Sequence, residues 1–178
     1  MATRPTKNNL RSIAEVAQTF RWHISFVRNP SAVKVPPNFN LQMTSTEVPK
    51  TDAGQSIEIG IRGHTIKRPG IYDDTHNITL NAVETIDNQW SEFLRTWRNA
   101  VWSRDTGVQQ NISDCTGDLL LTRLDNLDNP IWQYTLFGCY LEDSPPHDPT
   151  GGELGSDSEA LRPTLTLYYD TFNDGPAR

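Results

Sequence analysis

The side chains that could bind a metal ion in this chain are four histidines and two cysteines. A zinc site needs three or four such ligands at short, characteristic spacings. Cys115 and Cys139 do not belong to a CxxC pair, and two cysteines do not make a disulfide framework, so we expect two free thiols. We therefore predict no metal and no cofactor. The histidines lie on separate predicted elements: His23, His64, His76 and His147.

Carboxylates that are close in the sequence could act as a general acid and a general base. Asp73 with Asp74, and Asp125 with Asp128, are the candidate pairs, but each pair lies among turn residues. Aspartate is common in turns because its carboxylate accepts hydrogen bonds from the nearby backbone. The chain also contains no G-x-S-x-G nucleophile motif, no P-loop and no Rossmann fingerprint. We assign no catalytic residue and predict that the protein is not an enzyme.

Length and charge limit the remaining classes of protein. The chain has 178 residues and a formal net charge of −6, and we treat residues 1–178 as a single domain. An acidic chain is poorly suited to holding nucleic acid through its phosphates. No apolar run approaches the roughly 20 residues that span a bilayer, and residues 1–12 lack the apolar centre of a secretory signal. We therefore expect a protein that is made and kept in a cytoplasm.

One segment, residues 87–102, has the apolar spacing of an amphipathic helix. Asp87 or Asn88 is expected to cap its first turn by accepting a hydrogen bond from a free backbone N–H. We predict that the helix lies across the open face or end of a sheet, and that one stripe of its side chains closes the core. The members of that stripe are Trp90, Phe93, Leu94, Trp97 and Val101.

Alternation of apolar and polar residues predicts strands in most of the remaining chain. The expected strands cover residues 18–27, 39–48, 57–61, 75–85, 118–124, 131–141 and 163–172. The fold class that follows is mainly β, a small β-barrel or sandwich of about seven strands with one flanking α-helix, extended loops and terminal arms. In the strand at 131–141, one face would carry Trp132, Tyr134, Leu136, Gly138 and Tyr140.

Three segments are predicted to extend from this domain. They are an N-terminal arm at residues 1–17, an extended loop or hairpin at 49–72, and a Pro/Gly-rich loop at 142–162. Residues 104–116 and the end of the chain after 172 are polar, and we expect them to be a surface loop and a tail.

Several stretches, taken in order, resemble the tail tube proteins of contractile-tailed bacteriophages, the superfamily that includes the tube proteins of type VI secretion. The resemblance covers about residues 20–172. It rests on FRWHISFVRNP (20–30), NLQMTSTEVP (40–49), IEIGIRGHTIKRPGIYDD (57–74), THNITLNAVETIDNQWSEFLRTW (75–97), DLLLTRLDNLDNPIWQYTLFGCYLED (118–143) and LRPTLTLYYDTF (161–172).

The resemblance implies a function as a structural virion protein. Six copies would close into a ring, and rings would stack into the inner tail tube, the conduit for DNA ejection into the host. The implied partners are further copies of the chain, the tail sheath protein outside the tube, and the baseplate or hub and the tail terminator at its ends. Tape measure protein and double-stranded DNA would occupy the lumen transiently, and no membrane is involved. The protein would be assembled in the host cytoplasm and located in the virion tail.

The extended segment at 49–72 is the predicted element for building and stacking rings, because its expected tip, Lys67, Arg68 and Pro69, is basic in an otherwise acidic chain. The alternative for residues 64–72 is a solvated loop. Glu58 is a candidate lumen-facing residue, with Arg62 as a neighbouring counter-charge, since an acidic lumen repels DNA phosphates. The residues expected at contacts between subunits are Ile57, Ile59, Ile61, His64, Ile66, Lys67, Arg68 and Pro69.

Other functions stay open at this point. The chain could be a tube initiator or baseplate protein of the same fold, or the tube of a phage-derived injection system. A small-ligand-binding β-barrel is the alternative from another class, but the helix interrupts the strands and no hydrophobic cup is evident. Stacking on bases or sugars would require Trp102 or Trp132, because the other three tryptophans fall on predicted core faces.

Overall fold

A computed structural model describes residues 18–49, 56–70, 76–103, 106–109, 111–141 and 160–177. The predicted arm at 1–17 and nearly all of the predicted loop at 142–162 lie outside these ranges. The helices of the described part are α2 (Phe39–Gln42), α3 (Gln89–Val101) and α4 (Ile112–Cys115). The strands are β1 (Trp22–Arg28), β2 (Met43–Thr46), β3 (Ser56–Ile61), β4 (His64–Pro69), β5 (Asn77–Ala82), β6 (Gly117–Leu124), β7 (Pro130–Leu141), β8 (Thr164–Tyr168) and β9 (Thr171–Pro176).

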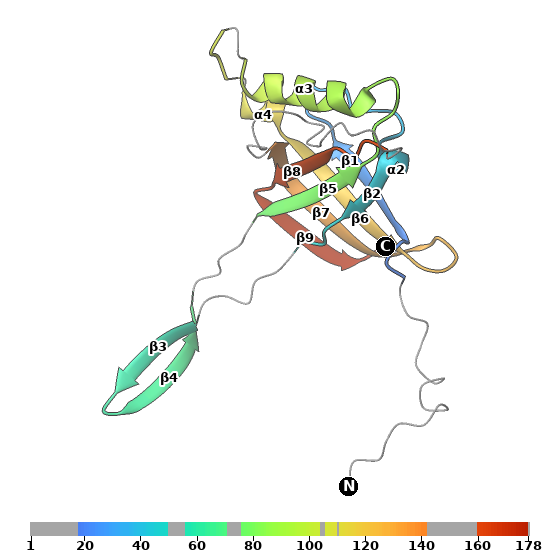
Figure 1. Ribbon diagram of the computed structural model, residues 1–178. Helices are drawn as coiled ribbons and strands as arrows, with labels where there is room; N and C mark the ends of the chain where they lie inside the picture. Colours follow the sequence, from blue (N-terminus) through green and yellow to red (C-terminus); the bar gives the residue numbers. More distant parts are fainter. Residues whose placement is uncertain are drawn as a thin grey trace.

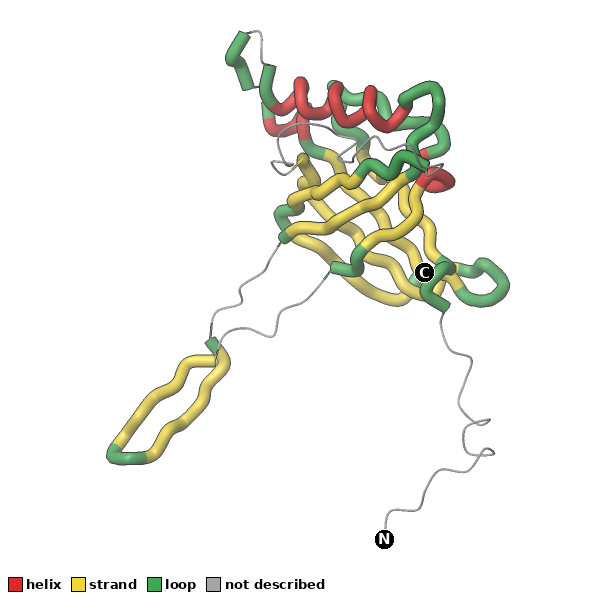
Figure 2. The backbone as a smooth tube through the Cα atoms, viewed as in Figure 1, coloured by secondary structure: helices red, strands yellow, loops and turns green. Residues whose placement is uncertain are grey.

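Seven of these strands form one antiparallel sheet, which confirms the mainly β prediction. The order is β1-β6-β7-β8-β5-β2, and β9 pairs with β7 beside this path. The sheet curls, as Figure 2 shows, but the described strands do not close into a barrel, because its end strands β1 and β2 are not paired. Helix α2 lies between those two ends, where the Asn40 Oδ1 accepts a hydrogen bond of 2.8 Å from the Ile24 N–H.

Helix α3 lies over one end of the curled sheet and fills its core (Figure 1). The predicted stripe is confirmed: Trp90, Phe93, Leu94 and Trp97 are buried, and Val101 is half-buried against the same core. Burial of such side chains is worth roughly 1.5 to 3 kcal/mol each relative to exposure. The helix therefore closes the hydrophobic interior, as its spacing predicted.

The cap of α3 differs from the prediction. Asn88 is the N-cap residue but lies in the left-handed region, with φ of 52°, and its side chain makes no cap hydrogen bond. The Glu84 carboxylate takes this role instead, accepting hydrogen bonds from the N–H groups of Trp90 at 3.1 Å and Ser91 at 2.8 Å. A carboxylate at this end also interacts favourably with the helix dipole. Glu84 lies outside the capping positions near the start of the helix, so the local sequence pattern did not point to it.

The predicted strands near the N-terminus are partly wrong. Phe39 begins a helical turn, and Leu41, which would share its face in a strand, is 81% exposed. Phe39 is held there by stacking on Trp90, with ring centroids 5.2 Å apart. Phe20, predicted on the core face of the first strand, precedes β1 and is 70% exposed.

The inward face of β7 also differs from simple alternation. Gly117 pairs with Cys139 and Leu119 pairs with Leu136, so three steps along β7 match two along β6. The extra residue forms a β-bulge, which reverses the alternation of side chains. Cys139 is consequently buried, and the predicted face holds for Tyr134 and Leu136 but not for Gly138 and Tyr140.

The C-terminal end contains one more strand than predicted. The single strand expected at 163–172 is divided into β8, which pairs with β5 and β7, and β9, which pairs with β7. Residues expected as a polar tail therefore belong to the sheet. The predicted surface loop at 104–116 is likewise wrong at its end, where Cys115 and Thr116 are buried.

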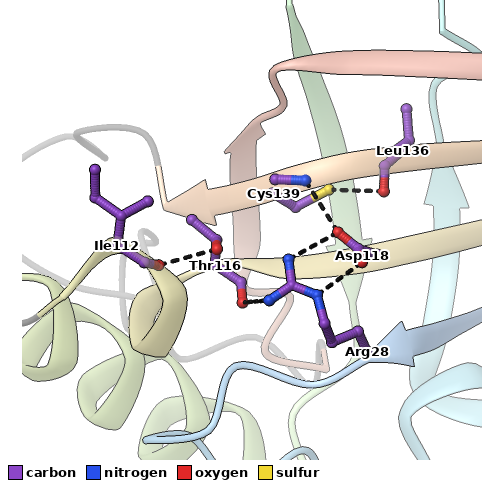
Figure 3. Close-up of polar contacts among 7 residues, drawn as sticks. Arg28, Ile112, Thr116, Asp118, Leu136 and Cys139 are labelled. Carbon is purple, nitrogen blue, oxygen red and sulfur yellow. Dashed lines mark hydrogen bonds and ion pairs between the residues drawn. The ribbon is translucent and has the colours of Figure 1, made fainter.

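A partly exposed ion pair joins β1 to β6 beside the bulge (Figure 3). Arg28 donates two hydrogen bonds to the Asp118 carboxylate, at 2.8 and 3.0 Å, and a third to the Thr116 carbonyl at 3.3 Å. The Gly138 N–H donates to the same carboxylate at 3.1 Å. The Arg28 guanidinium, with this N–H, holds the pKa of Asp118 below its ordinary value. The cluster thus fixes the point where three chain segments meet.

We expect Asp118→Asn to lower the free energy of unfolding at pH 7 by about 1 to 3 kcal/mol, because Arg28 loses a charged partner. A carboxyl with a lowered folded pKa stabilises the protein above its unfolded pKa, about 3.9, and this contribution disappears as pH falls through the folded value. Urea unfolding between pH 7 and 3 should show a smaller loss for Asp118→Asn than for wild type. Asp128→Asn is the matched control, because Asp128 is exposed in its pair with Arg21. Equal pH profiles for wild type and Asp118→Asn would contradict the assignment.

Candidate assembly surface

Strands β3 and β4 form a separate hairpin that lies away from the seven-stranded sheet (Figure 1). The pairing ends at Ile61 and His64, so Arg62 and Gly63 form a two-residue turn. Both have positive φ, 48° and 82°, which is typical of the type I′ turn that suits the twist of a hairpin. Every residue of both strands is exposed. The segment predicted as an extended loop or hairpin therefore contains a hairpin at residues 56–69, and the part expected to be irregular after residue 63 is a regular strand. The predicted basic tip is wrong, because Lys67, Arg68 and Pro69 pair with residues 56–58 at the end of the hairpin away from the turn.

One face of the hairpin is apolar. Residues opposite each other in the register share a face, and the pairs are Ile57 with Arg68, Ile59 with Ile66, and Ile61 with His64. Four isoleucines therefore lie together, flanked by one arginine and one histidine. We call this set the hairpin face. Its isoleucines remain partly in solvent: Ile57 is 52% exposed, Ile59 40%, Ile61 54% and Ile66 47%.

The opposite face of the hairpin is polar. Glu58 lies opposite Lys67, and their side chains form an ion pair of 2.7 Å. The counter-charge of Glu58 is thus Lys67, whereas Arg62, expected in that role, lies in the turn. Both side chains are more than half exposed, so this pair contributes at most about 1 kcal/mol. The residues predicted at subunit contacts divide between the two faces, since Lys67 and Pro69 lie on the polar face and the isoleucines on the other.

The hairpin is more basic than the rest of the chain. Residues 56–70 contain three basic side chains, Arg62, Lys67 and Arg68, and one carboxylate, Glu58. The whole chain, by contrast, has a net charge of −6. A two-stranded hairpin by itself is marginally stable in water, and a contiguous apolar patch on a protein surface commonly marks a binding site. The arrangement therefore suits binding to a protein surface that is apolar in its centre and acidic around it.

A second exposed apolar surface lies beyond the end of α3. Trp102 is 53% exposed, Val108 58% and Ile112 73%. The segment turns back on itself, since the Ser103 N–H donates to the Val108 carbonyl at 3.1 Å and Trp102 forms a bridge with Gln109. The sequence predicts a polar surface loop here, with Trp102 as its exposed aromatic residue. Apolar residues isolated in a polar loop were the signal that could have identified the surface.

Side chains that could serve chemistry are distributed differently. Within the described ranges, no group of three or more histidine, cysteine, aspartate and glutamate side chains is arranged to hold a metal ion. Asp125 accepts hydrogen bonds from the N–H groups of Leu127 and Asn129, so its predicted role in a turn is confirmed. Asp73 and Asp74 lie outside the described residues.

Both cysteines are buried free thiols, as predicted. Burial raises the pKa of Cys139 to about 12 and also raises the pKa of Cys115. The Cys115 thiol donates to the Ala100 carbonyl at 3.0 Å, which joins α4 to the end of α3. No helix of the described part of the chain is long and apolar enough to cross a membrane.

Comparison with known proteins identifies the fold. No protein-family model matches the chain, and no curated protein matches its sequence. Solved structures do match in shape. A chain of the anti-feeding prophage cap, the AFP tube-terminating cap, is 17% identical with a TM-score of 0.62, and the alignment covers 93% of this chain and 95% of that one.

Two chains from an extracellular contractile injection system are similar to the same degree. One is from the PVC sheath–tube complex in the extended state, with 16% identity, a TM-score of 0.62 and coverage of 97% and 100% of the two chains. The other is from the PVC sheath/tube terminator in the extended state, with 17% identity, a TM-score of 0.61 and coverage of 92% and 99%. The chain therefore has the tail-tube-like fold of contractile injection systems, and the resemblance in its sequence is confirmed at the level of the fold.

Proposed function

We propose that this protein is a structural subunit of the inner tube of a contractile tail or injection system. Six copies close into a ring and rings stack into a hollow tube, the conduit for DNA. The observation that carries the proposal is the hairpin face, four isoleucines that remain partly exposed and lie outside the hydrophobic core. A subunit that remained alone would gain nothing from this patch, whereas a neighbouring copy would cover it.

The chemistry of the chain supports a structural function. The core is closed by α3, and the carboxylates of Glu84, Asp125 and Asp118 serve the helix cap, a turn and the Arg28 cluster. Assembly partners follow from the same proposal: the sheath outside the tube, and the baseplate and terminator at its ends. The tube would be assembled in the cytoplasm and located in the tail particle.

The first test is assembly of the purified protein, followed by electron microscopy and mass measurement across a wide concentration range. Wild type should form rings or tubes of constant bore, alone or with other tail components. Ile59→Ser combined with Ile66→Ser should raise the concentration needed for assembly by about 10-fold or more, because two apolar contacts are lost. Glu58→Gln combined with Thr65→Ser is the matched control on the opposite face. Wild type that never assembles would disprove the proposal.

Hydrogen exchange provides a second measurement on the same segment. Amides of residues 64–70 should exchange rapidly in the monomer, since the hairpin is exposed and lies apart from the core. In the assembled tube they should be protected by at least about 10-fold, because the neighbouring copy holds the hairpin in place. Equal exchange in both states would assign ring contacts to another segment.

A tube terminator or cap is the second candidate function. The observation in its favour is that the chain is as similar to the cap and terminator structures as to the sheath–tube complex, with TM-scores of 0.61 to 0.62. A terminator would form single rings and halt tube growth, whereas a tube subunit polymerises without a defined length. Electron microscopy of the same preparations separates the two functions.

A further inference from the structure

We infer that the hairpin face of one copy docks in an apolar hollow at the end of α3 on another copy of this chain. The inference rests on the proposed function and names the receiving surface for the hairpin. A head-to-tail assembly needs two different patches on each subunit, one that fits the other, because the same operation joins every pair of neighbours. The hairpin face is one such patch, and the second must be elsewhere on the chain.

The hollow lies between the last turn of α3, helix α4 and the end of β7, and has a volume of about 390 Å³. Its apolar walls come from Val101, Ile112 and Tyr140, and Asp170 is the charged residue of its lining. We call it the α4 hollow. Ile112 is 73% exposed, and the exposed side chains of Trp102 and Val108 belong to the neighbouring segment. The hairpin face of another copy, placed here, would therefore cover both the hollow and the apolar surface beside it.

Two other hollows of the described chain have different chemistry. The hollow between β1 and β2 is lined mainly by polar side chains and contains no charged residue: Thr19, Phe20, Trp22, Asn40, Met43, Thr44, Ser45 and Thr46. The hollow beside the first half of α3 contains Lys34 as well as Glu92, together with two prolines. Of these three, the α4 hollow alone combines apolar walls with an acidic residue and no basic one.

Charge on the two patches is complementary. Arg68 lies on the hairpin face opposite Ile57, and Arg62 lies at its turn. The exposed Asp170 carboxylate lies in the lining of the α4 hollow. Opposite charges at the rim of an apolar contact direct the approach of two subunits and fix their register. We expect Arg68 and Asp170 to be the pair that fulfils this role.

The occupant is a second copy because the hairpin does not fill the hollow of its own chain. Figure 1 shows β3 and β4 on the other side of the seven-stranded sheet from α3 and α4. Both patches are thus left open in one subunit, and both are covered when copies join head to tail.

Cysteine cross-linking in the assembled full-length protein tests the contact. Chains carrying Ile59→Cys are mixed with chains carrying Ile112→Cys, assembled and treated with a mild oxidant. We expect a covalent dimer that contains one chain of each kind, and much less of it when Phe20→Cys replaces Ile112→Cys. The native thiols are buried, and mixtures of either variant with wild type measure their background. Tubes that form without the mixed dimer would overturn the inference and leave the proposed function intact.

A charge exchange supplies an independent readout. Arg68→Glu should slow assembly by about 10-fold or more, since like charges then meet at the rim. Asp170→Lys should restore assembly when it is combined with Arg68→Glu in the same chain. Absence of restoration together with absence of the mixed dimer would overturn the docking site. A chain carrying both cysteines that closes an internal disulfide as a dilute monomer would overturn it too, because the hairpin would then reach its own hollow. Wild type that forms no rings would overturn both the proposed function and this inference.

Discussion

Replacing Trp97 by alanine is expected to lower the free energy of unfolding by about 3 to 5 kcal/mol and to leave little soluble protein. Trp97 is fully buried, and its ring contacts Phe93 and Phe26 at centroid distances of 5.4 and 5.8 Å. Its indole N–H also donates to the Cys115 carbonyl at 2.7 Å, which fastens α4 to the core. The substitution leaves a large cavity and an unpaired buried carbonyl, and both destabilise the folded state.

Thermal or urea unfolding of the soluble fraction measures this effect. Trp102→Ala is the matched control, because the same residue type lies directly after the end of α3 at 53% exposure. Its free energy of unfolding should change by less than about 1 kcal/mol. A normal unfolding curve for Trp97→Ala would mean that α3 is peripheral to stability.

Gly138→Ala is expected to have the second largest effect, a loss of about 2 to 5 kcal/mol. Gly138 has φ of 66°, a conformation that costs a residue with a Cβ atom about 1 to 2 kcal/mol. The added methyl group would also collide with the Asp170 carboxylate. Relief of that collision requires the Asp170 side chain, the corner between β8 and β9 or the bulge itself to move, and the bulge is where the Asp118 carboxylate is held.

Gly175→Ala is the control for this substitution. Gly175 is also in a strand of the same sheet, but its φ is not positive and no atom lies within 4 Å of the position of an added Cβ. Unfolding in urea should show little change for Gly175→Ala and a clear loss for Gly138→Ala. Equal stability of the two variants would show that the bulge adapts without cost.

Assembly and stability are separable in this chain, because the proposed contacts lie outside the core. The hairpin face consists of exposed residues, and the lining of the α4 hollow includes the exposed residues Gln109, Ile112 and Asp170. Substitution of these exposed residues should alter ring formation with little change in unfolding. Trp97 and Gly138 should act in the opposite way. A variant that loses assembly while keeping the wild-type unfolding curve therefore reports on contacts between copies.

The sequence by itself determined the elements whose signal is local. The 3.6-residue period of Trp90, Phe93, Leu94 and Trp97 predicted both a helix and its buried face. Alternation along Ile57, Ile59 and Ile61, followed by turn residues, predicted the first strand of the hairpin and its end. These predictions succeed because the periods of helix and strand depend on backbone geometry alone. The order of such stretches was also sufficient to indicate the tail-tube-like fold.

Only the tertiary structure decided which distant groups meet. Glu84 caps α3 because the end of β5 brings its carboxylate to free N–H groups, and Phe39 leaves the strand pattern in order to stack on Trp90. The bulge at Gly138 reverses the face of β7, since a single extra residue shifts every side chain that follows. The α4 hollow likewise combines Val101, Ile112 and Asp170 from three separate parts of the chain. Interactions between segments far apart in sequence leave no periodic signal, so this part of the candidate site required the folded chain.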